Sequence, residues 1–294
     1  MHYTNEVIIN FAKTLSYADL TYYHGTYDEE SDIVLALMSI LDIDDFDEIP
    51  EAISSECYIK LKDAVEKRIS TKMPMAYIVD NSYLAGYRFF VNQNVMIPTS
   101  PIAFLLKDML KPWVKPENIN SILDLCTGSA ALSIIATKVF NPNLSEAVDI
   151  CENALTVARD NISKHDVNIN LIQSDLFNNV VNKYDLIISN PPYVSKTSYD
   201  SLPHEFTFEP KKAFISDNKG LDIPLRIICE SINFLNDDGV LLLEVGESDY
   251  LLESYINQPI LWLDTGNSAC GVCLFNKKEL IRIEKKIRLN NKGI

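Results

Sequence analysis

The residues best suited to chemistry are Asn190, Pro191, Pro192 and Tyr193, which follow a short apolar run at residues 184–189. The run has the length of a buried strand, and two prolines without a backbone N–H end it abruptly. The proline carbonyls and the Asn190 side-chain oxygen accept hydrogen bonds, and the Tyr193 ring can stack on a flat group. Since open α/β sheets bind ligands at the carboxyl ends of strands, the motif predicts a rigid pocket for a planar NH2 group. The alternative is an ordinary Pro-Pro turn.

An acidic residue also ends each of three earlier predicted strands. The first, Asp124, begins the segment Asp124-Leu125-Cys126-Thr127-Gly128-Ser129-Ala130, which leads into a predicted helix. A glycine here lets the backbone approach a ligand, and the first turn of the helix offers free N–H groups. The segment lacks the three glycines of the dinucleotide fingerprint, and a carboxylate does not suit a pyrophosphate. It suits a positively charged ligand, such as the sulfonium and amino groups of S-adenosylmethionine.

The two later acids extend this predicted cofactor site. Asp149 lies 25 residues further on, where a carboxylate can accept from both ribose hydroxyls. Asp175 follows the next strand and can accept from the adenine amino group while Leu176 packs on the ring. Each acid alone is more often a cap at a strand end, but three in succession indicate one site. The expected cofactor contacts are Asp124, Cys126, Thr127, Gly128, Ser129, Ala130, Asp149, Asp175, Leu176 and Asn190.

The elements that must position these residues alternate between strand and helix from residue 121 onward. Strands are predicted at 121–125, 144–149, 169–173, 184–189 and 239–245, and helices at 130–139, 152–164, 221–235 and 248–257. Two late strand candidates, 260–264 and 271–275, are typical of an antiparallel edge. The alternation predicts an α/β fold with a mostly parallel, doubly wound sheet.

The first part of the chain has a different pattern. Helical spacing of apolar residues is present at 5–20, 28–41 and 51–70, and β-prone runs follow at 76–79, 87–91 and 95–97. A further helix is predicted from 101 to about 110. We therefore divide the chain into a small helical domain (1–74), a β-hairpin linker (75–100), the α/β domain (101–280) and a basic tail (281–294).

Length and composition are those of an ordinary globular protein. The chain has 294 residues and no apolar run long enough to span a bilayer, and its first ten residues do not resemble a secretory signal. Six scattered cysteines are typical of a reduced, cytoplasmic protein. Cys270 and Cys273 form a CxxC pair, but without a second pair or a nearby histidine they predict no metal site.

Charge is distributed unevenly along the chain. Residues 14–59 contain twelve acidic residues and no Lys or Arg. The whole chain carries −15 and residues 277–294 carry +5, so the rest carries −20. A field of this sign repels nucleic acid and attracts a basic protein. We therefore expect no membrane partner and no stable nucleic-acid binding; the alternative is a surface kept soluble by its charge.

The two main motifs resemble the class I methyltransferases of the HemK/Prm type, which methylate a glutamine side-chain nitrogen. The resemblance extends to the runs YYHGT (22–26), LPHEFTFEP (202–210) and GNSACGVCLF (266–275), which are similar to the branch that acts on large-subunit ribosomal protein three. It implies a Rossmann-like methyltransferase domain and an N-terminal domain that recognises the protein substrate. It also implies S-adenosyl-L-methionine as cofactor, and catalysis by the Asn-Pro-Pro-Tyr (NPPY) motif at 190–193.

The sequence departs from this family at two positions, where the family usually has glycine instead of Ala130 and arginine instead of Thr99. If position 130 needs a positive φ, alanine costs about 1 kcal/mol there. These departures leave open a non-catalytic ribosome-assembly protein that retains the fold. An adenine-N6 methyltransferase of nucleic acid is the other alternative, because the same motif also serves an exocyclic amine on a flat base.

Overall fold

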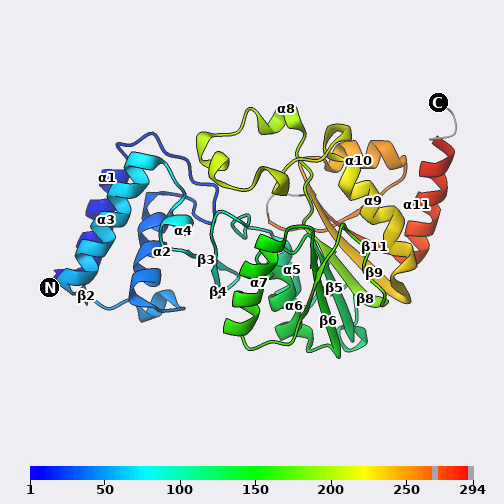
Figure 1. Ribbon diagram of the computed structural model, residues 1–294, viewed down its shortest axis with the longest axis horizontal. Helices are drawn as coiled ribbons and strands as arrows, with labels where there is room; N and C mark the ends of the chain where they lie inside the picture. The colour runs from blue at the N-terminus through cyan, green and yellow to red at the C-terminus, as the bar shows by residue number, and fades with distance from the viewer. Residues whose placement is uncertain (267–270, 291–294) are drawn as a thin grey trace. The chain divides into compact units, whose positions relative to one another are not determined.

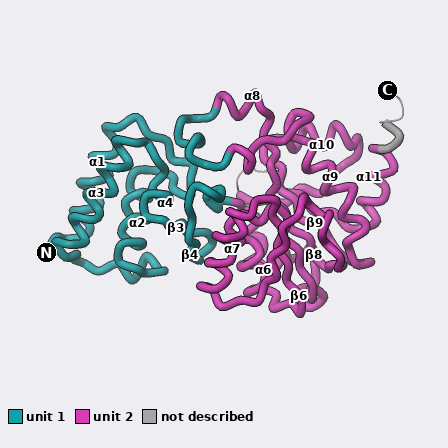
Figure 2. The backbone as a smooth tube through the Cα atoms, viewed as in Figure 1, with its two compact units in different colours: residues 1–99, 202–210 teal, residues 100–201, 211–294 magenta. Residues whose placement is uncertain are grey.

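The computed structural model describes residues 1–266 and 271–290 and shows two compact units (Figure 1). Unit 1 comprises residues 1–99 and 202–210, and unit 2 comprises residues 100–201 and 211–294 (Figure 2). The chain therefore passes from one unit to the other three times. Cys270, half of the CxxC pair, and residues 267–269 and 291–294 lie outside the described residues.

Unit 1 is built on helices whose apolar faces pack together. Its helices are α1 (Thr4–Leu15), α2 (Glu29–Leu41), α3 (Ser55–Thr71) and α4 (Met75–Ile78), with 3-10 turns at Phe46–Glu48 and His204–Phe208. Its strands are β1 (His2–Tyr3), β2 (Ala52–Ile53) and the hairpin pair β3 (Asn81–Leu84) and β4 (Tyr87–Phe90). A capping box starts α2, because the Asp28 side chain accepts from the Ser31 N–H and the Ser31 side chain accepts from Asp28 N–H.

Two β-prone runs in this unit do not form strands. Residues 76–79, expected as a strand, lie in α4 and its C-terminal cap. Pro74 fixes the backbone at the helix start, and its carbonyl accepts from the N–H groups of Tyr77 and Ile78. Burial of Met75, Ala76 and Tyr77 within the helical layer outweighs the local β-propensity. The run at 95–97 forms no strand either.

Unit 2 contains a seven-stranded sheet, which confirms the predicted α/β fold. Its order is β10-β11-β9-β8-β5-β6-β7; β5 to β9 are parallel, whereas β11 runs antiparallel to β9 and β10 antiparallel to β11. The strands are β5 (Ser121–Leu125), β6 (Leu144–Asp149), β7 (Asn170–Gln173), β8 (Tyr184–Ser189), β9 (Leu235–Gly246), β10 (Leu261–Trp262) and β11 (Gly271–Asn276).

Helices cover both faces of this sheet. The helices of unit 2 are α5 (Ile102–Lys107), α6 (Ala131–Phe140), α7 (Glu152–Lys164), α8 (Lys196–Tyr199), α9 (Asp222–Glu230), α10 (Asp249–Ile256) and α11 (Lys277–Asn290). Short 3-10 turns lie at Pro116–Asn118, Lys211–Ala213, Asn218–Gly220 and Ser231–Asn233. Helices α5 to α7 lie on one side of the sheet, and α9 and α11 lie on the other (Figure 1).

The strand order creates a topological switch point between β5 and β8. From β5 the chain builds outward through β6 and β7, and it then returns to β8 and builds the other way through β9. Helices that connect strands in opposite directions leave a crevice at the carboxyl ends of the two central strands. The segment at 124–130 and the NPPY motif begin at these two ends.

Helix α11 overlaps the stretch expected to be a basic tail. Its Leu280, Ile283 and Ile287 side chains are buried in the unit 2 core. The Lys277 Nζ atom donates to the Leu235 carbonyl at 2.9 Å and helps to fix the start of the helix. Spacing of three and four residues between these apolar side chains is the pattern of a packed helix face.

Candidate active site

Asp124 lies at the centre of the segment after β5. Its side chain is buried, and its Oδ2 atom accepts from Thr127 Oγ1 at 2.6 Å and from the Ser133 N–H at 3.2 Å. Burial raises the pKa of Asp124 to about 7. Within residues 1–266 and 271–290, no Lys, Arg or His forms an ion pair with it. A carboxyl in this state is suited to a positively charged ligand.

The backbone of this segment is strained and open at one point. Cys126, Gly128 and Ala130 all have positive φ, at 60°, 55° and 66°. A Cβ atom added to Gly128 would meet no atom within 4 Å, so the backbone borders open space. Ala130 lies at the start of α6 with a positive φ, so the conformational cost of about 1 kcal/mol expected for an alanine at this position applies. Ser129 is buried and its carbonyl accepts from Asn161 Nδ2 at 2.9 Å.

Asp149 connects the end of β6 to this same segment. Its Oδ2 atom accepts from the Gly128 N–H and its Oδ1 atom from the Cys151 N–H, both at 2.9 Å. Burial raises the pKa of Asp149. The carboxylate expected to contact the ribose therefore lies beside the open backbone of Gly128.

Asp175 has a partner that the sequence did not reveal. Its carboxylate oxygens lie 3.1 and 3.2 Å from Nη2 of Arg226 on α9. Leu176 is buried and has a positive φ of 46°. The expected adenine contacts at these two residues stay predictions, and Arg226 is an additional candidate for orienting the Asp175 carboxylate.

The NPPY motif follows β8 directly and lies beside the β5 segment. Ser189, the last residue of β8, donates through Oγ to the Leu125 carbonyl at 2.9 Å. Asn190 is half-buried, and in the described part of the chain its side chain makes no hydrogen bond. Pro191 is buried, whereas Pro192 and Tyr193 are half-buried. Asn190 therefore directly follows the end of β8, next to the end of β5, and its side-chain amide is available to a ligand.

Tyr193 is fixed by residues that the sequence analysis missed. Its hydroxyl donates to Glu244 Oε1 at 2.9 Å, and Ser100 Oγ donates to the other Glu244 oxygen. Glu244 lies on β9, is 3% exposed, and has a pKa raised by burial. Gly246 makes room for the ring, because a Cβ there would lie 2.4 Å from it. A charged residue inside the apolar β9 run was the signal available in the sequence.

The residues present fit S-adenosylmethionine. The acids Asp124 and Asp149 suit its positive charge and its ribose, and the open backbone at Gly128 lets a ligand approach. These residues and the half-buried Asn190 would hold the cofactor, which supplies an electrophilic methyl group when bound. Among the described residues, no cluster of three His, Cys, Asp or Glu side chains could hold a metal ion.

The fold and this site define the class of protein: an S-adenosylmethionine-dependent methyltransferase. Residues 102–217 match the family described as methyltransferase small domain. Among solved structures, the hMettl16 catalytic domain in complex with MAT2A 3'UTR hairpin 6 has the same fold, with 12% identity and a TM-score of 0.50. The similarity covers 76% of this chain and 82% of that one.

Two curated relatives specify the family further. The ribosomal protein uL3 glutamine methyltransferase of Francisella tularensis subsp. tularensis is 37% identical over 267 residues, which cover 88% of this chain and 85% of the relative. The protein of the same name from Bordetella pertussis is 36% identical over 226 residues, which cover 75% of this chain and 76% of that relative. The chain belongs to this family of glutamine methyltransferases. Within its described residues, no helix is long and apolar enough to cross a membrane.

Proposed function

We propose that this protein transfers a methyl group from S-adenosylmethionine to the side-chain amide nitrogen, N5, of a glutamine in ribosomal protein uL3. The observation that carries the proposal is Asn190, whose side chain makes no hydrogen bond in the described chain and which directly follows Ser189, the residue of β8 that pairs with the end of β5. Relatives that share most of this chain are named for that substrate. We place the reaction in the cytoplasm.

In this proposal the chain acts by positioning the amide. An amide nitrogen is a weak nucleophile, because its lone pair is delocalised into the carbonyl. The Asn190 side-chain oxygen and the Pro191 carbonyl accept the two N–H bonds of the glutamine, while Pro192 and Tyr193 hold the amide plane. This arrangement aims the nitrogen at the methyl carbon for in-line transfer. Orientation and well-placed acceptors then supply most of the catalysis without a strong base.

Unit 1 supplies the surface for a basic protein substrate. Of the twelve acidic residues between positions 14 and 59, all except Glu29 and Asp32 are exposed. An acidic surface attracts the basic substrate at a distance, and this attraction weakens as salt screens it. The −20 charge outside the last 18 residues disfavours nucleic acid as the substrate.

The test is methyl transfer from labelled S-adenosylmethionine to purified uL3 by the wild type and Asn190→Ala. We expect the substitution to lower kcat on the order of 100-fold or more, because an oriented polar contact in the transition state is lost. Because Asn190 is also an expected cofactor contact, cofactor affinity is measured separately by calorimetric titration, and kcat is compared at saturating cofactor. Asn178→Ala, at an exposed asparagine after β7, is the matched control and should retain full activity.

Other outcomes separate the alternatives. Label on glutamine with the wild type and not with Asn190→Ala would support the proposal. Tight cofactor binding without transfer to uL3 would favour the non-catalytic assembly role, and label on adenine in RNA or DNA would favour the nucleic-acid enzyme. If the acidic surface docks uL3, the KM should also rise between 0.05 and about 0.5 M salt.

A further inference from the structure

The segment that follows the NPPY motif is built into unit 1. Residues 202–210 belong to unit 1, although the chain on both sides of them belongs to unit 2 (Figure 2). Only residues 194–201 separate Tyr193 from this segment. Val194 is fixed at the other end, because its N–H and its carbonyl both pair with the backbone of residues 214–216. The catalytic motif and unit 1 are thus joined by a short length of chain.

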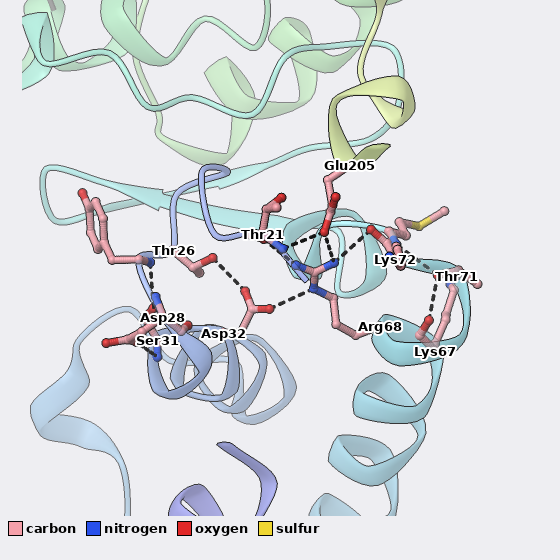
Figure 3. A network of polar contacts seen from close by, with 12 residues as sticks. Thr21, Thr26, Asp28, Ser31, Asp32, Lys67, Arg68, Thr71, Lys72 and Glu205 are labelled. Carbon is pink, nitrogen blue, oxygen red and sulfur yellow. Dashed lines mark hydrogen bonds and ion pairs between the residues drawn. The ribbon is translucent and has the colours of Figure 1, made fainter. Parts of the chain in front are cut away.

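Glu205 is the first anchor of the segment. Its buried Oε1 atom accepts from the Thr21 N–H at 2.7 Å and lies 3.8 Å from Arg68 Nη1 (Figure 3). Arg68 is fully buried and donates to Asp32 at 2.9 Å and to the carbonyls of Thr21 and Lys72 at 2.8 and 2.9 Å. Glu205 therefore contacts two separate parts of unit 1, Thr21 and Arg68, and Arg68 is itself held by Asp32 and by the Thr21 and Lys72 carbonyls.

Glu209 is the second anchor. Its Oε2 atom accepts from the Ile97 N–H at 2.8 Å, and its Oε1 atom lies 3.0 Å from Nε2 of the buried His24. Between the two anchors, the Phe206 ring packs on His24, with centroids 4.5 Å apart, and lies 6.3 Å from the Tyr23 ring. The YYHGT and LPHEFTFEP runs, which are far apart in the sequence, are therefore interlocked within unit 1.

The buried charged groups around the segment 202–210 are unusual for a protein core. Three buried carboxylates, from Asp32, Glu205 and Glu209, face one guanidinium and one imidazole. Buried ion pairs seldom stabilise a fold more than well-packed apolar residues would, because desolvation offsets their attraction. Their hydrogen bonds, however, also restrict where the segment can lie, because each donor must stay within hydrogen-bond distance of its carboxylate oxygen. A segment held in this way is fixed in position more strictly than packing alone requires.

We propose that Glu205 and Glu209 are positioning residues, which fix the path of residues 194–210 and through it the access of the protein substrate to the NPPY motif. The second part of this inference rests on the function proposed above. The first part concerns the chain alone and has its own measurement. Neither glutamate is expected to contact the cofactor.

The test compares Glu205→Leu and Glu209→Leu with the conservative variants Glu205→Gln and Glu209→Gln in the full chain. Amide hydrogen exchange should accelerate at least tenfold in residues 194–210 of the Leu variants and remain unchanged in residues 121–135. The KM for uL3 should rise at least fivefold with cofactor affinity within twofold of wild type. The Gln variants should recover part of both effects, because an amide oxygen still accepts from the Thr21 or Ile97 N–H.

Glu66→Gln, at an exposed glutamate on α3, is the control and should change neither measurement. Unchanged exchange in residues 194–210 of folded Leu variants would overturn the proposal. So would a lower melting temperature accompanied by unchanged kinetics below it, since that result defines a purely structural role. If the wild type does not methylate uL3, the proposed function fails, whereas the exchange measurement still tests the anchors.

Discussion

Buried carboxylates in the two units have opposite surroundings. In unit 1, Asp32 and Glu205 face Arg68, and Glu209 faces His24. In unit 2 the buried Asp124, Glu146 and Glu244 and the half-buried Asp149 accept hydrogen bonds from hydroxyl, side-chain amide or backbone N–H groups. None of these four has a cationic side chain within ion-pair distance in the described chain.

This difference separates structure from function. A buried carboxylate with a cation partner holds its own unit together, whereas one without such a partner raises the electrostatic cost of the fold. Buried carboxylates without a cation partner are found more often at functional sites. In unit 2 Asp124 and Asp149, which have no cation partner, lie at the sheet edge where we expect the cationic cofactor to bind. Glu244 is different again, because both of its oxygens hold neighbouring hydroxyl groups.

The largest expected effect comes from a substitution that removes the cation of the buried unit 1 network. Arg68→Met leaves Asp32 and Glu205 buried without their cation and should lower the free energy of unfolding by about 3–5 kcal/mol. Urea denaturation followed by a probe in unit 1 measures it. Lys62→Met, at an exposed pair on α3, should cost less than about 1 kcal/mol. A loss below 1 kcal/mol for Arg68→Met would contradict the structural role.

The next effect concerns Asp124, whose substitution should weaken cofactor binding without lowering stability, unlike that of Arg68. Asp124→Asn should weaken S-adenosylmethionine binding on the order of 100-fold by removing a buried negative charge. Stability at pH 8 should not fall, because the ionised side chain is costly there. Asp160→Asn, on the exposed face of α7, serves as the control. Calorimetric titration that shows unchanged affinity would exclude Asp124 from the cofactor site.

The pH dependence of Asp124 sharpens this prediction. Its pKa is about 7 in the fold and about 3.9 in an unfolded chain, so between these values the folded state binds the extra proton. Its contribution to stability therefore falls as pH rises from about 4 to 7. A cationic cofactor favours the ionised form, so wild-type affinity should rise up to about pH 7, and Asp124→Asn should lack this rise.

A smaller effect is expected where the unpaired carboxylate positions a neighbour. Glu244→Leu removes the acceptor of the Tyr193 hydroxyl and should lower kcat about 10- to 30-fold, which corresponds to one hydrogen bond to a charged group. Glu244→Gln keeps an acceptor and should remain within about fivefold of wild type. In combination with Tyr193→Phe, the effect of Glu244→Leu should be less than additive. Additive losses would show that the two residues act separately.

The smallest effect concerns the backbone next to Asp124. Ala130→Gly relieves a left-handed conformation and should raise the free energy of unfolding by about 1 kcal/mol. Ala136→Gly, within α6, should have the opposite sign because its φ is helical. Chemical denaturation of both variants measures the difference. A neutral or destabilising Ala130→Gly would mean that the methyl group of Ala130 contributes more packing than strain.

The sequence predicted those features that depend on neighbouring residues in the chain. Apolar runs interrupted by loops located the strands of unit 2, and the acids at their ends followed from the same pattern. Glu244 was missed, because its partners Ser100 and Tyr193 lie 144 and 51 positions away. Pairings at such distances are determined by the folded topology and not by local propensity. Residues 76–79 were predicted wrongly because tertiary burial overrode their β-propensity.

The late return of the chain to unit 1 has a consequence for its biosynthesis. Glu205 and Glu209 are made after more than half of unit 2, so the N-terminal part of the chain leaves the ribosome before its own core can close. At roughly 5–20 residues per second, synthesis of residues 100–210 takes roughly 5–20 s. During this interval Arg68 and His24 have been synthesised, but Glu205 and Glu209 have not. We therefore expect residues 1–99 alone to be less stable than the complete unit 1, because the partners of Arg68 and His24 in residues 202–210 would be missing.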